Sequence, residues 1–177
     1  GAGVTVDLIA GTAVGAVGSN IGSDTLLNFN QVRGTNFDDT ILGSDRTDLT
    51  ESYEGRGGDD LIDGRGGFDY VRYDSATAGV TGSLVNGIVT GAGIGTDTLV
   101  NIDGVFGSAH NDVLTGGSNS TYITTQYEFF QGGLGDDSID GGDGHDAASY
   151  QSASGSVVVD LSAGTATGAD GNDTLLN

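Results

Sequence analysis

The chain of 177 residues contains no cysteine, proline, methionine, tryptophan or lysine. The lack of cysteine excludes disulfide cross-links and cysteine-ligated zinc sites. Arginine supplies all five basic side chains, against 25 acidic residues, and the formal net charge is -20. Because a polyanion of this kind repels nucleic acids and anionic membrane surfaces, we expect neither as a partner.

Long apolar segments are also absent. No stretch approaches the roughly 20 residues of a membrane-spanning helix, so we expect no membrane insertion. No secretory signal is visible, and the chain begins and ends inside its own repeat, so we expect it to be part of a larger protein. Composition alone, with low hydrophobicity and high net charge, favours disorder. A regular spacing of glycine, aspartate and aliphatic residues favours a folded chain instead.

Glycine is abundant, with 34 copies, and it recurs in a unit of nine residues. The unit occurs in tandem over residues 55–63 and 64–72, and again over residues 132–140 and 141–149. Glycines come first, an aspartate stands at the sixth position and an apolar residue at the eighth. Glycine allows the backbone to turn sharply, and the apolar residue can be buried by a short strand. Residues 34–42 and 107–115 fit the same pattern.

A longer repeat contains these units. We divide the chain into a first block (residues 1–78), a second block (residues 79–155) and the start of a third (residues 156–177), which together form one continuous array. Each block opens with an alternating strand, a turn rich in Gly, Thr and Ala, and a returning strand.

No segment shows the apolar periodicity of a helix, and the glycine content disfavours helices. We therefore predict an all-β solenoid in which each unit buries its apolar residue by stacking on its neighbours. The predicted core residues are Leu26, Ile41, Ile62, Val71, Leu99, Leu114, Ile139 and Leu175.

The tandem units closely resemble the RTX (repeats-in-toxin) calcium-binding family, whose consensus is Gly-Gly-x-Gly-x-Asp-x-aliphatic-x. The resemblance covers essentially the whole chain and implies a right-handed parallel β-roll. It further implies that Ca²⁺ ions lie between turns one repeat apart, held by the position-six aspartates and by backbone carbonyls. Calcium takes six to eight oxygen ligands, which such turns can supply.

The resemblance also implies a set of metal ligands. Three pairs are expected to face one another, namely Asp39 with Asp60, Asp48 with Asp69, and Asp112 with Asp137. Four further aspartates occupy matching places: Asp24, Asp97, Asp146 and Asp173.

Several residues depart from the family pattern. Arg56 and Arg65 replace the second glycine, and a nearby cation should weaken a calcium site unless the guanidinium points into solvent. The unit that begins at Gly116 has Thr121 where the aspartate belongs, so the turn near Asp146 is expected to lack an ion. A Gly-Asp turn can also be an Asx-type turn with a solvated carboxylate. Several phased copies favour metal binding over this alternative.

Catalysis is not indicated. The chain has no Gly-x-Ser-x-Gly elbow, and its two isolated histidines cannot form the paired helical site of a zinc protease. We therefore expect a protein that is not an enzyme.

The predicted function is that of a calcium-binding structural module in a larger secreted or cell-surface bacterial protein. It would fold on Ca²⁺ binding outside the cell after type I secretion, as an adhesin stalk, surface-layer or filament subunit. Its partners would be several calcium ions and neighbouring repeat blocks of the same chain or of other copies. An alternative is an accessory domain that drives the folding and secretion of a toxin or hydrolase. A weaker alternative, a carbohydrate- or ice-binding surface, depends on the insert at residues 118–130.

Overall fold

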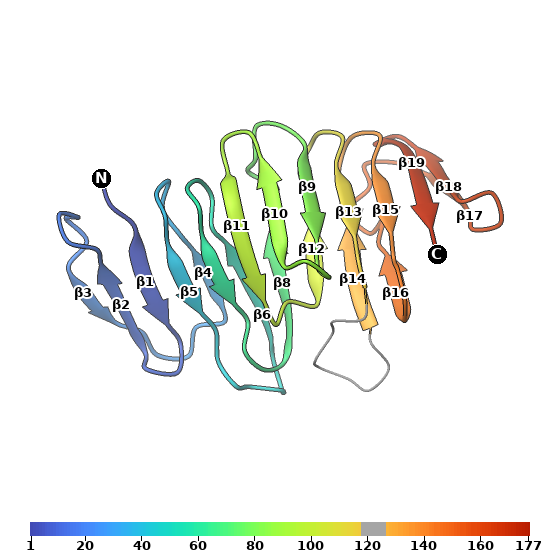
Figure 1. Cartoon of the computed structure of the whole chain (residues 1–177). Helices are drawn as coiled ribbons and strands as arrows, with labels where there is room; N and C mark the ends of the chain where they lie inside the picture. Colours follow the sequence, from blue (N-terminus) through green and yellow to red (C-terminus); the bar gives the residue numbers. More distant parts are fainter. Residues whose placement is uncertain (118–126) are drawn as a thin grey trace.

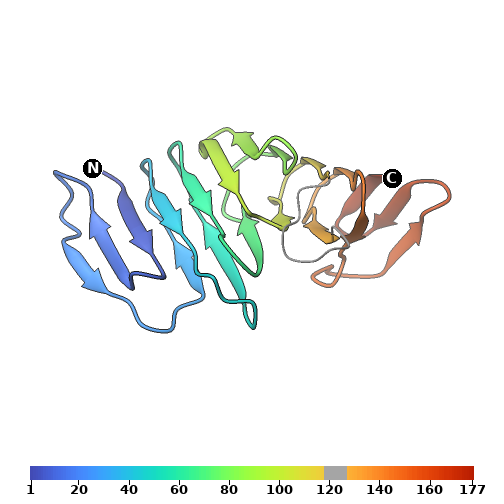
Figure 2. The same ribbon diagram turned by 60° about the horizontal axis from the view of Figure 1, so that its bottom comes forward.

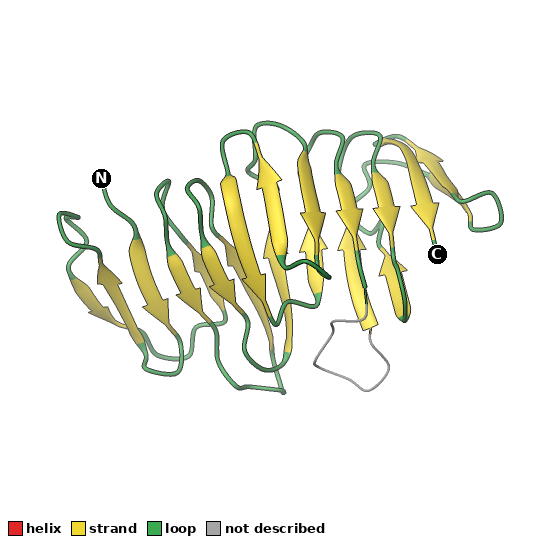
Figure 3. Cartoon of the chain, viewed as in Figure 1, coloured by secondary structure: helices red, strands yellow, loops and turns green. Residues whose placement is uncertain are grey.

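Every regular element in the computed structural model, which describes residues 1–117 and 127–177, is a β-strand (Figure 3). The strands are β1 (Val4–Asp7), β2 (Thr12–Gly15), β3 (Ser23–Thr25), β4 (Gln31–Arg33), β5 (Thr40–Leu42), β6 (Thr50–Glu54), β7 (Leu61–Asp63), β8 (Phe68–Arg72), β9 (Val80–Ser83), β10 (Ile88–Gly91), β11 (Gly95–Val100), β12 (Gly104–Phe106), β13 (Val113–Thr115), β14 (Tyr127–Gln131), β15 (Ser138–Asp140), β16 (His145–Ala148), β17 (Val157–Asp160), β18 (Thr165–Gly168) and β19 (Gly171–Leu176). The predicted all-β class is confirmed. Within the two described ranges, no helix is long and apolar enough to cross a membrane.

The strands form two sheets that lie one behind the other (Figure 1). The larger sheet has 13 strands in the order β17-β18-β19-β15-β13-β9-β10-β11-β7-β5-β1-β2-β3, and the smaller has six in the order β16-β14-β12-β8-β6-β4. From β4 to β8 the chain alternates between the two sheets strand by strand, and it does so again from β11 to β17. The two chain ends lie toward opposite ends of this row of strands, as the view in Figure 2 also shows.

Two kinds of strand pairing build the larger sheet. Strands that follow glycine-rich turns pair in parallel, with Ile41 beside Ile62 and Leu114 beside Ile139. Each block opens instead with three antiparallel strands, β1-β2-β3, β9-β10-β11 and β17-β18-β19, which we call the meanders. The predicted strand, turn and return is thereby confirmed. A tight turn reverses the chain at once, and strands joined in this way can pair only antiparallel.

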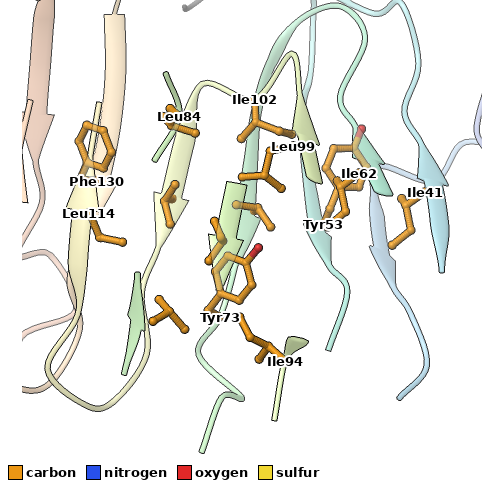
Figure 4. Close-up of a cluster of buried hydrophobic side chains, with 14 of the residues drawn as sticks. Ile41, Tyr53, Ile62, Tyr73, Leu84, Ile94, Leu99, Ile102, Leu114 and Phe130 are labelled. Atoms are coloured by element: carbon orange, nitrogen blue, oxygen red, sulfur yellow. The ribbon is translucent and has the colours of Figure 1, made fainter. Parts of the chain in front are cut away.

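The hydrophobic core lies between the sheets (Figure 4). The predicted core residues Ile41, Ile62, Val71, Leu99, Leu114 and Ile139 are all buried. Leu26 and Leu175 are only half-buried. Leu26 directly follows β3 and Leu175 lies in β19. The terminal meanders extend beyond the ends of the six-stranded sheet at β4 and β16 (Figure 1).

Replacing Ile62 with alanine should be strongly destabilising, because its side chain is fully buried, at 0% exposure, in this core. Truncation of a buried isoleucine typically lowers the free energy of unfolding by about 2–5 kcal/mol. The adjacent Leu61 is 38% exposed on the opposite face of the same strand, so Leu61→Ala is the matched control. Urea titrations of both variants, in saturating divalent cation, measure the difference. Equal losses would contradict the inward orientation of Ile62.

Candidate functional site: the stacked glycine-aspartate turns

Along one side of the molecule, glycine-rich turns lead from the six-stranded sheet into the larger one. The position-six aspartates Asp39, Asp60, Asp112 and Asp137 stand at the ends of these turns and are at most 3% exposed. Oδ1 of Asp60 accepts the backbone N–H of Asp39 (2.7 Å), and Oδ1 of Asp97 accepts that of Asp60 (3.1 Å). We call this series of carboxylates the first row. The predicted neighbours Asp39 and Asp60 do lie together.

The second block repeats the arrangement. Oδ1 of Asp137 accepts the backbone N–H of Asp112 (2.9 Å), and Oδ1 of Asp173 accepts that of Asp137 (3.0 Å). Asp97 and Asp173 therefore hold matching places, with partners that the sequence had left undefined. Asp24, the equivalent residue of the first meander, is exposed on the edge strand β3.

A second row lies along the opposite side, where the chain passes from the larger sheet to the smaller one. Oδ1 of Asp69 accepts the backbone N–H of Glu51 (3.2 Å), and Oδ2 of Asp103 accepts that of Asp69 (3.0 Å). Glu128 and Asp146 are paired in register in the second block. Glu51, Asp103 and Glu128 were not predicted. Glu51 and Glu128 do share one sequence signal, since each is an acid two residues before a buried aromatic residue.

The predicted placement of Asp48 opposite Asp69 is wrong. Asp48 is exposed, and its carboxylate forms an ion pair with Arg46 (2.9 Å). Glu51 lies opposite Asp69 in the strand register instead. Extra residues between Gly43 and Gly55 lengthen this unit, so the acid that enters the strand is Glu51.

In the unit from Gly116, it is Glu128 that lies beside Asp146. The expectation for that turn rested on Thr121, which lies outside the described residues.

Two classes of buried carboxylate occur in the two rows. In the first class, the position-two residue of the same turn donates hydrogen bonds to both oxygens of the carboxylate, and we call such a turn closed. Thr35 donates its backbone N–H to Oδ2 of Asp39 (2.5 Å) and its hydroxyl to Oδ1 (3.0 Å). Ser108 closes Asp112 in the same way (2.6 and 2.8 Å). The hydroxyl of Tyr73 donates to Oδ2 of Asp97 (2.9 Å).

The other class has one bare oxygen. Oδ2 of Asp60, Asp69 and Asp137 is buried and has no hydrogen-bond partner among the described residues. The same holds for Oδ1 of the half-buried Asp146. A buried oxygen that lacks a partner is costly, because it has lost its hydration without replacing it. Such an oxygen is satisfied by a cation or by a proton.

Glycine at position one is required by this geometry. A Cβ built on Gly55 would lie 2.0 Å from Oδ2 of Asp60, and one on Gly132 would lie 2.1 Å from Oδ2 of Asp137. The bare oxygen thus lies directly against the backbone at the start of its own turn. Glycine-rich backbone near a carboxylate offers carbonyl oxygens as further ligands for a hard cation.

Burial makes these carboxyls weak acids. It raises the pKa of Asp60 and of Asp137 to about 7, that of Asp69 to about 8 and that of Asp97 to about 6. Desolvation of the charged form is the main cause, and repulsion by neighbouring carboxylates adds to it for each of the four. The ionised form therefore needs compensating positive charge.

Arginine does not supply that charge in the described part of the chain. Arg56 has an exposed side chain. The guanidinium of Arg65 pairs with Asp7 (2.9 Å) and donates to the carbonyl of Gly43 (2.8 Å), rather than to Asp69. Neither arginine therefore forms an ion pair with Asp60 or Asp69 that would compete with a bound cation.

The aspartates at position five also join neighbouring turns, but each accepts a backbone N–H from the segment that follows its turn, whereas Asp60 accepts one from the turn that precedes it. Oδ1 of Asp38 accepts the backbone N–H of Asp59 (2.9 Å), and Oδ1 of Asp59 accepts that of Thr96 (2.8 Å). These carboxylates are exposed. An Asp-Asp doublet thus links its turn to both neighbours, with one buried and one solvated hydrogen bond.

Side chains alone do not form a metal cage. Residues 1–117 and 127–177 contain no group of three or more His, Asp or Glu side chains that could hold a metal ion. A cation at Asp60, Asp69 or Asp137 would therefore need backbone oxygens as well. Searches with protein-family models found no match to the chain, and comparison with curated proteins found no significant similarity.

Gly55→Ala should destabilise the folded protein severely, because the new methyl group would overlap Oδ2 of Asp60. Gly66→Ala is a suitable control, since a Cβ there makes only ordinary contact, 3.5 Å from Cα of Asp45. Thermal unfolding followed by circular dichroism should show a large fall in Tm for the first variant and a small change for the second. Similar Tm values would contradict the tight approach of carboxylate and glycine.

The metal-free protein should become less stable as the pH rises from about 4 to about 8. An unfolded aspartate has a pKa of about 3.9, and the folded-state pKa of Asp60, Asp69 and Asp137 is raised to between about 7 and about 8. The folded state therefore binds more protons in this window, and its advantage is lost as they dissociate. The folded fraction of cation-stripped protein, measured by circular dichroism from pH 5 to pH 8, tests this. Higher stability at pH 8 would refute it.

Proposed function

We propose that the chain is a calcium-binding structural module of the RTX type, part of a larger secreted or cell-surface bacterial protein. The observation that supports this most directly is the bare, buried Oδ2 of Asp60, Asp69 and Asp137, each in a glycine-rich turn. Calcium is a hard cation that prefers carboxylate and carbonyl oxygens, and these turns offer both. Its charge would compensate carboxylates whose ionised form is disfavoured by burial.

The candidate ligands differ in how well they fit. Asp60, Asp69 and Asp137 fit best, and Asp146 also has a bare oxygen. Asp97 accepts the backbone N–H of Asp60, and Asp173 accepts that of Asp137. They therefore help to hold in place the residues that carry the bare oxygens. The exposed Asp24 and Asp48 fit less well.

For the fold, we propose a right-handed parallel β-roll that the antiparallel meanders interrupt. The regular alternation of the chain between two sheets supports this, as does the parallel pairing of the strands after each glycine-rich turn. In such a roll, successive turns along one side stack at the spacing of neighbouring strands, about 4.7–4.9 Å. The two rows of carboxylates follow from that stacking.

Calcium binding would be coupled to folding. Ordering the backbone costs about 1–2 kcal/mol per residue, and a chain of charge -20 also repels itself when compact. Sites in extracellular modules typically have Kd values of about 10⁻⁴ to 10⁻³ M. Such a chain would remain unfolded in a low-calcium cytoplasm and fold outside the cell, as type I secretion requires. The proposed role involves no catalysis.

Within this proposal, a scaffold is the favoured role. The 13-stranded sheet runs through all three blocks and ends in the edge strands β3 and β17. Edge strands offer unpaired backbone groups to further strands, so neighbouring blocks or other copies can extend the array. An accessory domain for a toxin or hydrolase is the alternative. The carbohydrate- or ice-binding alternative rested on the insert at 118–130, of which residues 118–126 lie outside the described residues.

Calcium should convert the cation-stripped chain at pH 8 from a largely disordered state to a β-rich one.

Asp60→Ala and Asp137→Ala should lower the apparent calcium affinity at least tenfold, equivalent to about 1.4 kcal/mol, because each removes a buried ligand. Asp74→Ala is the control, since Asp74 is an exposed residue paired with Arg72. Calcium titrations followed by circular dichroism measure all three midpoints.

A β-rich spectrum in excess chelator at pH 8 would remove calcium from the folding argument. Equal midpoints for the three variants would mean that the turns are wrongly assigned as ligands. Magnesium serves as a second cation in the same titration, because its smaller and stricter octahedral geometry suits a flexible, carbonyl-rich turn less well.

A further inference from the structure

We propose that the residue at position two of each nine-residue unit decides whether its turn is open to a cation. By this inference, Thr35 and Ser108 keep two turns of the first row closed, and Ca²⁺ binds at the turns that follow them. The inference rests on the proposed calcium-binding function and specifies which turns of the stack take part.

The closed turns share one local geometry. In both, the position-two residue donates its backbone N–H and its hydroxyl to the position-six carboxylate of the same turn. A further backbone N–H, from Val4 or Val80, reaches the same carboxylate (2.6 and 2.7 Å). With three donors directed at it, the carboxylate of Asp39 or Asp112 has its oxygens occupied by the chain itself.

The open turns differ in backbone handedness at position two. The φ angle there is +80° for Arg56, +62° for Arg65, +109° for Gly133 and +80° for Gly142. Neither Thr35 nor Ser108 has a positive φ. In the two open turns of the second row, the position-two N–H is directed elsewhere: that of Arg65 donates to Asp63 (2.9 Å) and that of Gly142 to Asp140 (3.2 Å).

Arg56 and Arg65 show that the positive φ angle at position two is not confined to glycine. A positive φ is uncommon for residues other than glycine and is strained for a bulky side chain. Arg56 and Arg65 nevertheless adopt it, in turns whose carboxylates keep a bare, buried oxygen. The open conformation is therefore maintained against local strain, which is expected where it serves to receive a ligand.

The order of closed and open turns is the same in both blocks. In the first block the unit at 34–42 is closed and the unit at 55–63 is open, and in the second block the units at 107–115 and 132–140 repeat this order. Each open carboxylate, Asp60 or Asp137, thus lies between a turn closed by Thr35 or Ser108 and the meander aspartate Asp97 or Asp173. One calcium ion per block is expected in the first row.

Substitutions at position two test the inference by counting bound calcium. Ser108→Gly removes the hydroxyl and allows the left-handed backbone, so it should add one ion per chain. Arg56→Thr places a β-branched residue where φ is +80°, so it should favour the closed geometry and remove one ion. The measurement is the molar ratio of Ca²⁺ to protein by equilibrium dialysis at saturating calcium, with circular dichroism as a check of folding.

Two matched controls accompany these variants. Ser162 also donates its N–H and hydroxyl to an aspartate, Asp160, but in an exposed turn outside the stack. Ser162→Gly should therefore leave the calcium count unchanged. Arg46→Thr removes an exposed arginine and its ion pair with Asp48 and should also leave the count unchanged. The controls separate an effect of the turn from an effect of lost charge or of glycine itself.

The outcomes distinguish this inference from the proposed function. Absence of bound calcium in the unsubstituted protein refutes both. Calcium binding with an unchanged count in Ser108→Gly refutes the inference alone, whatever the folding of Arg56→Thr. One ion gained in Ser108→Gly, and one lost in a folded Arg56→Thr, supports it. Loss of the added ion in the double variant Ser108→Gly with Asp112→Asn would assign that ion to the newly opened turn, and its retention would refute the assignment.

Discussion

Buried carboxylates between stacked turns are the constraint on which the rest of the structure depends. Each needs a hydrogen-bond donor, and the backbone N–H of a neighbouring turn or strand supplies one, as between Asp60 and Asp39. This bond requires close stacking of the turns, which in turn requires glycine at position one, because Oδ2 of Asp60 occupies the space of a Cβ at Gly55. Parallel pairing of the strands that leave the turns follows from the same stacking. The position of glycine in each unit, the geometry of the turns and the strand register therefore all depend on the same hydrogen-bonded stacking of turns.

The hydrophobic core and the carboxylate rows are physically joined by tyrosine. Tyr53 is fully buried in the core, and its hydroxyl donates to Oε2 of Glu51 (2.6 Å). Tyr73 does the same for Oδ2 of Asp97 (2.9 Å). A buried tyrosine offers a large apolar surface and one polar group that needs a partner. Movement of a turn would therefore disturb the packing between the sheets, so cation binding at the turns and ordering of the core are expected to be cooperative.

Much of the fold follows from local pattern, and the exceptions have physical causes. The apolar eighth position of the nine-residue units correctly predicts buried residues such as Ile62 and Ile139, because strand residues alternate between faces. The neighbours Asp39 and Asp60 follow from the period of the repeat. Asp48 does not face Asp69, because added residues in its unit shift the strand register to Glu51, and an insertion's effect on register cannot be derived from a consensus. The closing role of Thr35 depends on the hydrogen bonds of its N–H and hydroxyl, which a consensus of glycine, aspartate and apolar positions does not describe.

Cohesion outside the turns has a different origin. On the six-stranded sheet, the rings of Tyr70 and Phe106 lie 5.0 Å apart and those of Phe106 and Phe129 lie 5.5 Å apart, across neighbouring strands. The guanidinium carbon of Arg72 lies 4.6 Å from the centre of the Phe106 ring. Cross-strand contacts of this kind stabilise a sheet without metal, whereas the turns contain carboxylates whose pKa is raised by burial and whose ionised form is favoured by added positive charge. The largest upward pKa shifts of carboxyl groups in the described part of the chain lie in the two rows of turns, so a main part of the dependence of folding on cation and pH is expected to arise there.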